Sequence, residues 1–341
     1  MKRILFIIIL IIVIAGGLSG YLAWKFVYQP NTAIQKEISF YIRHTDDYES
    51  IKSKLVEQNI VEDIETFDWV AQKMNLPNHI YSGRYLIRPN LNNRNLIELL
   101  RSGQQTPIRI TFNNIRTKEQ LALRLSEEIE PDSAEIAELL FNSAIAKKYG
   151  FDSESFLCMF IPNTYEVYWD ISTTQLFDRM HKEYTRFWTE EKKSKAKSMK
   201  LTPVEISILA SIVQKESSFI EEYPEIAGVY YNRLKRGMKL QADPTVVYAA
   251  GDFTIKRVLL KHLAIDSPYN TYKYKGLPPG PISLPTIQAI NSVLNKKSHK
   301  YFYFCAKDDF SGKHVFSKTH RQHIENANRY RRALNKRKIY E

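Results

Sequence analysis

The first 24 residues form the most apolar part of the sequence. From Ile4 to Trp24 there is no charged residue, and a helix of that length crosses the roughly 30 Å hydrocarbon core of a membrane. Lys2 and Arg3 precede this run, so the tail is expected in the cytoplasm and everything after about residue 30 outside it. A cleaved signal peptide is the alternative, since Ala15, Gly16, Gly17 and Ser19 are small, but the run is longer than usual and no clean A-x-A site follows.

A second pattern, apolar residues in period two and then in a period near 3.6, occurs twice. It is carried by ISFYIRHTDDYESIKSKLVE from Ile38 and by IRITFNNIRTKEQLALRLSE from Ile108, which align without a gap. This order predicts a strand, a turn and a helix in each copy. Between the copies we expect a helix in FDWVAQKMNL, a strand in SGRYLIRP and a helix in NRNLIELLRSG, which together make a small α+β module.

The pattern then becomes mainly helical. From about residue 131 to 188 it predicts helices with a loop at FIPNTYEVYW, and the lysine-rich EEKKSKAKSMK predicts an exposed connection. A central helix begins after Thr202, which suits the N-cap position. Pro203 suits the first turn, and Glu205 completes a T-x-x-E capping box.

One acidic residue interrupts the apolar stripe of this central helix. At 100° per residue Glu216 falls in the middle of the stripe. A carboxyl group facing a core is either paired or has a raised pKa, and a neutral carboxyl near pH 7 can act as a general acid. Periodicity alone favours a buried Glu216 tied to an Arg, a Lys or nearby backbone. The stripe contains Val204, Ile208, Leu209, Ile212, Val213, Phe219 and Ile220; Ser207, Ser211, Gln214 and Ser218 lie opposite. Glu221 and Glu222 lie past the expected helix end and are expected in solvent.

Three further segments follow the central helix. YPEIAGVYYNRLKRGMKL predicts an amphipathic helix ended by Gly237, and LQADPTVVYAAG predicts a short helix with Asp243 as its N-cap. DSPYNTYKYKGLPPGPISLPTIQAI is rich in Pro, Gly and Tyr, which indicates a rigid loop that either lines a groove or wraps the core. YFYFCAKDDFSGKHVFSKTH predicts two strands joined by a turn at Ser311 and Gly312.

Composition limits the partners. The net charge is +12, with much of the excess in RYRRALNKRKIYE at the C-terminus. An extracytoplasmic position excludes nucleic acid and leaves anionic membrane or wall polymer, although a solvated terminal helix is the favoured interpretation. Cys158 and Cys305 are far apart, and spacing alone does not decide whether they form a disulfide.

An ordered set of motifs gives the sequence its most specific signal. SIVQKES, LQADPTVVYA, SPYNTYKYKGLPPGPI and YFYF...GKHVFSKTHRQH, within about residues 153–330, resemble the endolytic murein transglycosylases, the MltG or YceG-like family. The upstream span and a LysM-like module with SGRYLI and LIELLRSG are similar too. The resemblance implies a single-pass enzyme of the bacterial inner membrane. Its catalytic domain would face the periplasm, cut nascent peptidoglycan strands to leave 1,6-anhydro-N-acetylmuramic acid ends, and need neither metal nor cofactor.

The resemblance also implies residue roles. Glu216 would be the catalytic acid, and after protonating the glycosidic oxygen it would accept the proton of the sugar's C6 hydroxyl. Ser283 to Thr286 replace an Asn-Pro-Gly turn usual in the family, and Asn163 replaces a usual Asp, which leaves substrate preference open. The implied substrate-binding residues are Gln241, Asp243, Thr245, Tyr248, Tyr269, Asn270, Thr271, Tyr272, His314, Ser317, Thr319 and His323.

Two alternatives belong to other functional classes. One is a hydrolase (a muramidase) with Asp243 or Asp266 as second carboxylate, which a helix-capping Asp243 would disfavour. The other is a wall-binding scaffold without activity. The spacing of His314, His320 and His323 matches no strong metal-ligand pattern.

The expected fold class is α+β, in four parts. These are an anchor (1–30), a LysM-like module (31–105), a second small βα unit (106–150) and a mixed α/β catalytic domain with the acid on a central helix (151–341). The expected partners are glycan strands, the membrane and peptidoglycan synthases of elongation or division.

Overall fold

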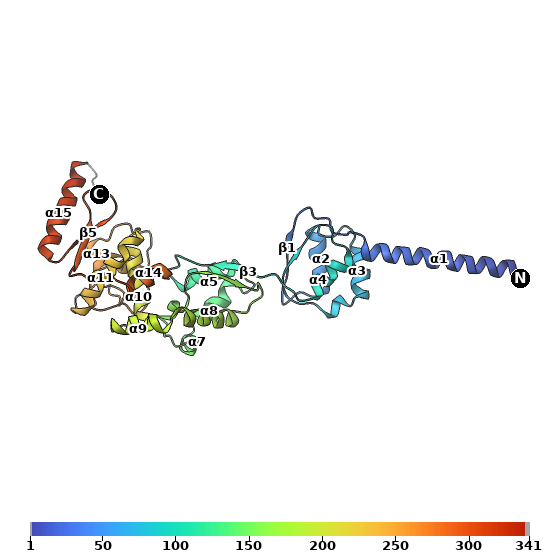
Figure 1. Cartoon of the computed structure of the whole chain (residues 1–341), viewed down its shortest axis with the longest axis horizontal. Coiled ribbons are helices and arrows are strands. Elements are labelled where there is room, and N and C mark those ends of the chain that lie inside the picture. Colours follow the sequence, from blue (N-terminus) through green and yellow to red (C-terminus); the bar gives the residue numbers. More distant parts are fainter. Residues whose placement is uncertain (1, 338–341) are drawn as a thin grey trace. The chain divides into compact units, whose positions relative to one another are not determined.

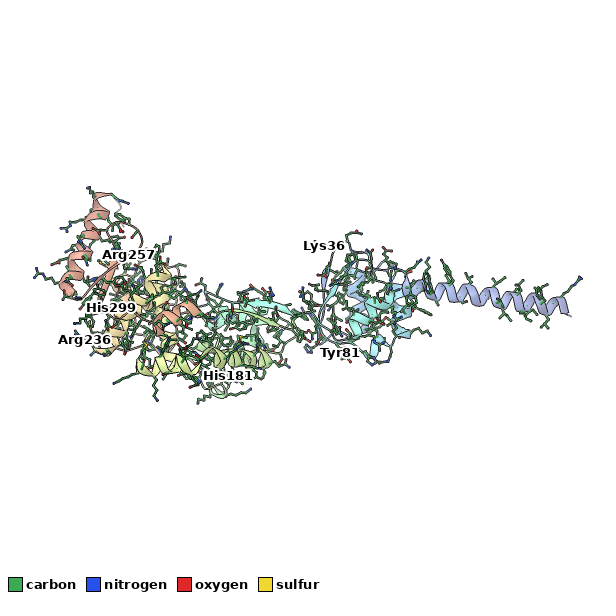
Figure 2. All side chains as sticks on the ribbon, in the orientation of Figure 1. Lys36, Tyr81, His181, Arg236, Arg257 and His299 are labelled. Atoms are coloured by element: carbon green, nitrogen blue, oxygen red, sulfur yellow. The ribbon has the colours of Figure 1, made fainter. Side chains whose placement is uncertain are left out.

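The computed structural model describes residues 2–337 and mixes helices with short antiparallel strands. The chain folds into two compact units (Figure 1; side chains in Figure 2). Unit 1 contains the residues up to 110 together with 128–131 and 166–172, and unit 2 contains 111–127, 132–165 and the residues from 173 onward. The mixture of helix and strand confirms the expected class at this level. The four-part division and the LysM-like assignment stay predictions.

Unit 1 begins with the apolar helix α1 (Lys2–Tyr28). From Arg3 onward it is long and apolar enough to cross a membrane, and none of this stretch is buried; a signal sequence would meet the same test. Its C-terminal turn packs on the rest of unit 1, where the Asn93 side-chain amide donates a hydrogen bond of 2.9 Å to the Phe26 carbonyl. The Phe26 ring meets the edge of Trp69, with centroids 5.9 Å apart. The end of α1 is therefore fixed to the folded unit.

The rest of unit 1 is a small α+β layer, as the pattern predicts. Strand β1 pairs antiparallel with β2, with Phe40 opposite Tyr85, and both side chains are fully buried. The strand, turn and helix predicted for each repeat copy are confirmed, in β1 and α2 and again in β3 and α5. The bounds in unit 1 are β1 (Ile38–Ile42), α2 (Tyr48–Glu57), α3 (Ile64–Lys73), η1 (Leu76–Asn78), β2 (Gly83–Ile87) and α4 (Asn93–Arg101). Strand β3 (Ile108–Thr111) runs from unit 1 into unit 2, and α5 (Lys118–Ser126) belongs to unit 2.

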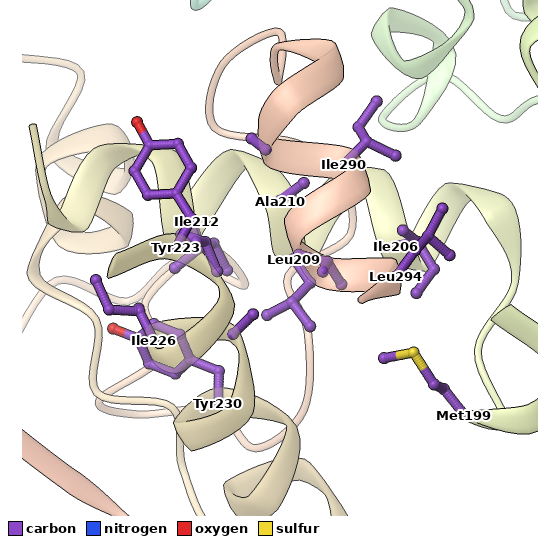
Figure 3. Close-up of a cluster of buried hydrophobic side chains, with 14 of the residues drawn as sticks. Met199, Ile206, Leu209, Ala210, Ile212, Tyr223, Ile226, Tyr230, Ile290 and Leu294 are labelled. Atoms are coloured by element: carbon purple, nitrogen blue, oxygen red, sulfur yellow. The ribbon is translucent and has the colours of Figure 1, made fainter. Parts of the chain in front are cut away.

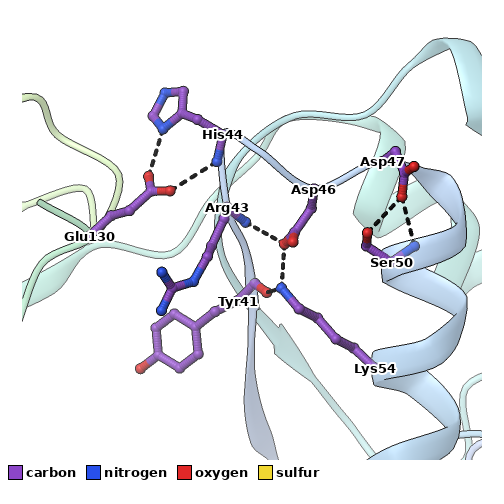
Figure 4. Close-up of polar contacts among 8 residues, drawn as sticks. All are labelled: Tyr41, Arg43, His44, Asp46, Asp47, Ser50, Lys54 and Glu130. Atoms are coloured by element: carbon purple, nitrogen blue, oxygen red, sulfur yellow. Dashed lines mark hydrogen bonds and ion pairs between the residues drawn. The ribbon is translucent and has the colours of Figure 1, made fainter.

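Polar contacts fix the turn between β1 and α2 (Figure 4). Asp47 caps α2 by accepting the Ser50 N–H at 2.8 Å. Glu130, from the short segment 128–131, accepts the backbone N–H of His44 at 2.9 Å, and its other oxygen lies 2.6 Å from the His44 ring nitrogen. These bonds explain why a segment distant in sequence belongs to unit 1.

The first part of unit 2 departs from the pattern in two places. The expected loop at FIPNTYEVYW contains strand β4, which pairs with β3. The expected exposed connection is helix α9, capped by Thr189 and supported by a 2.9 Å ion pair between Glu191 and Lys195. The bounds are α6 (Ser133–Phe141), α7 (Ser143–Lys148), η2 (Phe156–Met159), β4 (Thr164–Val167), α8 (Thr173–Phe187) and α9 (Glu190–Ser198).

Helix α10 (Pro203–Glu216) is the centre of unit 2 and packs against α11 (Tyr223–Lys235) and α14 (Ile287–Leu294). Figure 3 shows the apolar side chains between these helices. The predicted Thr202 to Glu205 capping box is confirmed. The helix is nevertheless shorter than the stripe, because it ends at Glu216 and the short η3 (Ile220–Glu222) follows. Its polar face is covered too: Ser207 and Ser211 are both buried.

The C-terminal part of unit 2 agrees with most of the pattern. Gly237 follows α11 with φ of 61°, and the hairpin of β5 and β6 is confirmed. The final helix α15 has no buried residue. Cys158, which is buried, and Cys305 are free thiols. The remaining bounds are α12 (Asp243–Ala250), α13 (Leu260–Leu263), β5 (Tyr303–Ala306), β6 (His314–Ser317) and α15 (His320–Lys336).

Candidate active site

Glu216 is the last residue of α10 and stands at the edge of the core of unit 2. The phenol of Tyr230, a buried residue of α11, donates a hydrogen bond to its Oε1. Figure 3 shows Tyr230 among the side chains that fill the core between α10 and α11. The packing of these two helices therefore positions the pair. The expected tie to an Arg, a Lys or backbone is replaced by a bond to a phenol.

The surroundings of Glu216 favour its neutral form. Burial raises the pKa of its carboxyl to about 7; the Tyr230 hydrogen bond lowers it, the charge of Asp243 raises it and that of Arg233 lowers it. A carboxyl with a pKa near 7 holds its proton in about half of the molecules at neutral pH. It can therefore give a proton away and take one back.

Asp243 is not the N-cap that the sequence suggests. Helix α12 starts at Asp243, its cap position is Ala242, and no side chain caps it. The Asp243 carboxylate instead accepts the Tyr272 hydroxyl at 2.5 Å. The capping interpretation is wrong because the Asp-Pro pair stands one position further into the helix than expected. The Asp243 side chain therefore does not cap its own helix and lines the candidate site instead.

Glu216 and Asp243 together line two adjoining cavities of unit 2. The first, of about 400 Å³, is named the aromatic cavity after Tyr230, Tyr272, Tyr303, Phe304 and the rings of His320 and His323. The second, of about 470 Å³, is named the basic cavity after Arg116, Lys215, Lys256 and Arg257, which line it with Tyr248 and Phe253. Both volumes fall in the range of small-ligand sites. The two carboxyl groups therefore stand where the two cavities meet.

The aromatic cavity presents rings in fixed positions. The His323 ring stacks on Tyr303, with centroids 5.5 Å apart, and the Arg233 guanidinium lies 5.1 Å from the Tyr303 centroid. Arg233 donates to the carbonyls of Phe302 (2.7 Å) and Leu240 (2.8 Å), so it holds the cavity wall together. Burial lowers the pKa of His323, as do the nearby charges of His320 and Arg233. Such planar faces suit the apolar faces of sugar rings.

The structure separates the predicted substrate-binding residues into three groups. Gln241, Asp243, Tyr248, Tyr272 and His323 line the two cavities. The second group, which is Thr245, Tyr269, Asn270 and Thr271, lies behind this lining and is buried. The third group, which is His314, Ser317 and Thr319, lines neither cavity.

The second group holds the loop that carries Tyr272. The hydroxyls of Thr245 and Thr271 lie 2.8 Å apart. The Asn270 amide donates to two carbonyls of the preceding loop, at 3.0 and 2.8 Å, and Tyr269 donates to a carboxylate oxygen of Glu154 at 2.8 Å. These residues fix the loop from beneath.

The third group ties the hairpin to the rest of unit 2. The backbone N–H of His314 donates to Glu222 at 2.8 Å, and its ring nitrogen lies 2.9 Å from the other oxygen of that carboxylate. Glu222 is therefore buried, which corrects its expected exposure. Ser317 accepts from the Asn326 amide, and Thr319 caps α15. These contacts stabilise the fold next to the site.

Several lining residues had no signal in the pattern. Tyr230 falls in an amphipathic helix, where periodicity treats a tyrosine as core. Arg116 and Phe253 come from segments outside the quoted family motifs, and Lys215 lies in SIVQKES without a predicted role. The aromatic run at residues 301–304 was the one available hint, and its Tyr303 and Phe304 line the aromatic cavity.

A sequence profile of the YceG-like family matches residues 40–329. The chain belongs to the YceG-like family. The resemblance noted from the motifs is therefore confirmed.

Individual relatives of this family member are informative as well. The chain is 36% identical over 217 residues to an endolytic murein transglycosylase of Bacillus subtilis, which covers 63% of this chain and 58% of that protein. It is 28% identical over 356 residues to an endolytic murein transglycosylase of Streptococcus pneumoniae, and this match covers 94% of this chain and 63% of that protein. A crystal structure of a YceG-like protein from Listeria monocytogenes matches with a TM-score of 0.57 and 26% identity, over 86% of this chain and 99% of that one. The chain spans about three fifths of the length of these two transglycosylases.

Proposed function

We propose that this protein is a lytic transglycosylase of murein with Glu216 as its catalytic group. The observation that carries the proposal is the half-buried Glu216 carboxyl at the junction of two cavities, where burial raises its pKa to about 7. The name shared by its relatives, endolytic murein transglycosylase, supports the substrate and the reaction class. The bond cut is the β-1,4 link from N-acetylmuramic acid to N-acetylglucosamine inside a strand.

The reaction needs one carboxyl group in two roles. Protonated Glu216 gives its proton to the glycosidic oxygen, the bond from C1 to that oxygen breaks, and positive charge develops at C1. The ionised Glu216 then accepts the proton of the C6 hydroxyl on the same sugar, whose oxygen bonds to C1. The 1,6-anhydro ring forms and no water is consumed. Because Tyr230 occupies Oε1, Oε2 is the oxygen that carries the moving proton.

Asp243, which lines the same two cavities as Glu216, assists in this reaction. Its negative charge helps to keep the proton on Glu216 and would stabilise the positive charge at C1. Tyr272 holds Asp243 in place through its 2.5 Å hydrogen bond. A hydrolase is the second candidate, because a carboxylate that lines both cavities could act on a water molecule.

Helix α1 would locate the enzyme at the membrane, and the rest of unit 1 would retain the substrate. Helix α1 would anchor the chain in the cytoplasmic membrane, with the rest of unit 1 and unit 2 on the extracytoplasmic side. Unit 1 would act as a LysM-like module that holds the glycan strand, and peptidoglycan synthases of elongation or division would be partners that supply it. No nucleic acid takes part.

A binding and cleavage experiment tests the proposal. The full chain in detergent and its Glu216→Gln variant are incubated with peptidoglycan, and sedimentation with the polymer and new glycan ends are measured together. We expect both proteins to sediment and the wild type alone to form 1,6-anhydro ends. Sedimentation without new ends in either protein would instead support a scaffold.

A further inference from the structure

Positive charge is distributed unequally about Glu216. The basic cavity is lined by Arg116, Lys215, Lys256 and Arg257. On the aromatic side the lining contains one Lys or Arg, Arg233, whose Nε and Nη1 donate to backbone carbonyls and to Gln241. A ligand that crosses Glu216 therefore meets cations on one side and rings on the other.

Two of the cations, Arg116 and Lys215, are held by contacts with the cavity wall, and Lys256 is exposed. The Arg116 guanidinium lies 4.6 Å from the centroid of Phe253. The Lys215 ammonium donates to the Asn114 side-chain oxygen at 2.7 Å, and burial, with a smaller contribution from Arg116, lowers its pKa. Within residues 2–337, no carboxylate lies within ion-pair distance of Arg116, Lys215 or Lys256. Their charge is left for a ligand.

Murein itself is asymmetric in charge. Its N-acetylglucosamine is neutral, whereas its N-acetylmuramic acid carries a lactyl group that ends in a carboxylate or in a peptide with carboxylates. The basic cavity includes Glu216 in its lining. An anion bound there is therefore close to the sugar whose C1 faces the acid.

We propose that the basic cavity binds the carboxylate on the acidic substituent of the sugar at the cleavage point. This inference rests on the proposed function and extends it. It assigns Arg116 and Lys256 to substrate binding and gives them control of register, because a strand shifted by one sugar would place neutral N-acetylglucosamine in the cavity. A pyrophosphate at a lipid-linked strand end is the other source of negative charge.

Removal of charge from the substrate tests the inference without any change to the protein. Peptide-free glycan strands are compared with the same strands after their lactyl carboxylates are converted to methylamides, and KM and kcat for anhydro-end formation are measured. We expect wild-type KM to rise about tenfold on the amidated strands, the size of one charge-assisted hydrogen bond, with kcat within twofold. Equal KM on both substrates, with anhydro ends formed, would overturn the inference and leave the proposed function standing. No ends on either would overturn both.

Variants locate the effect. In Arg116→Gln combined with Lys256→Gln, KM on native strands should rise to the amidated value and amidation should have no further effect. Lys197→Gln, at an exposed position of α9, is the matched control and should behave as wild type. Lys215 is left unchanged because it adjoins Glu216. Amidated strands with and without a lipid pyrophosphate at their end are then compared. If the double variant is impaired on those with the pyrophosphate and not on those without it, the pyrophosphate is the anion and the carboxylate proposal is wrong.

Discussion

The phenol of Tyr230 on α11 donates a hydrogen bond to the carboxyl of Glu216 at the end of α10. The bond opposes the effect of burial on the Glu216 pKa, while the charge of Asp243 adds to it. Burial is the largest cause of the raised pKa, and Tyr230 and Asp243 change it in opposite directions. Each can be removed by an isosteric substitution.

Tyr230→Phe should move the activity profile to higher pH. The substitution removes a hydrogen bond that lowers the Glu216 pKa, so the fall of kcat/KM on the alkaline side, expected near pH 7, should shift upward. Tyr231→Phe, at the next position of α11, is the control and should leave the profile in place. If the Tyr230→Phe profile coincides with that of the wild type, this hydrogen bond does not influence the ionisation that limits kcat/KM.

Asp243→Asn should move the same profile to lower pH. The carboxylate raises the Glu216 pKa, and an amide of the same shape removes its charge. We also expect a lower maximum rate, because the charge that stabilises positive C1 is lost. An upward shift would contradict the assigned sign of the interaction.

Glu216→Gln should stabilise the fold at high pH while it removes activity. Glu216 titrates near 7 in the folded protein against 4.5 for a free glutamate, so the folded state binds more protons between these values and wild-type stability falls as pH rises from 4.5 to 7. The glutamine has no such loss. Above pH 7 we expect a gain on the order of 2 kcal/mol in unfolding free energy, measured by urea denaturation. At pH 4.5 the two proteins should differ little, and an equal gain at both pH values would exclude the ionisation as its cause.

Helices, strands and turns that are determined by residues close together in the sequence were predictable. The capping box at Thr202, the turn at Gly312 and the two strand-turn-helix repeats each depend on residues a few positions apart. Glu216 was found for a related reason, since periodicity alone places it among apolar residues.

Features fixed by distant residues were missed or misassigned. Strand β4 forms by pairing with β3, which lies more than 50 positions earlier in the chain. Glu222 is buried because His314 pairs with it, and Asp243 contacts Tyr272 rather than its own helix end. Pattern within a short window carries no information on such pairs.

Gly280→Ala should destabilise unit 2. An added Cβ would lie 2.2 Å from the Glu154 carbonyl oxygen and 2.7 Å from the Tyr269 hydroxyl, so the loop beneath the site must move. We expect a loss of about 2 kcal/mol or more in unfolding free energy. Gly276→Ala has open space but a φ of 88°, and should cost only about 1 kcal/mol. An equal effect of the two would contradict the close contact.

Deletion of residues 31–105 should impair cleavage of long strands more than of short oligomers, because unit 1 is expected to hold polymer. Rates on strands sorted by length measure this. Equal loss on both lengths would mean that this segment only supports the rest of the chain.

The most direct test follows oxygen from water into the product. The wild-type protein is incubated with peptidoglycan in water enriched in oxygen-18, and the new glycan ends are weighed by mass spectrometry beside those from Glu216→Gln. The account predicts ends one water lighter than a reducing sugar, without the heavy isotope, and none from the variant. Reducing ends that carry oxygen-18 would show hydrolysis, contradict the role given to the C6 hydroxyl and make Asp243 the first residue to examine as a second catalytic carboxylate.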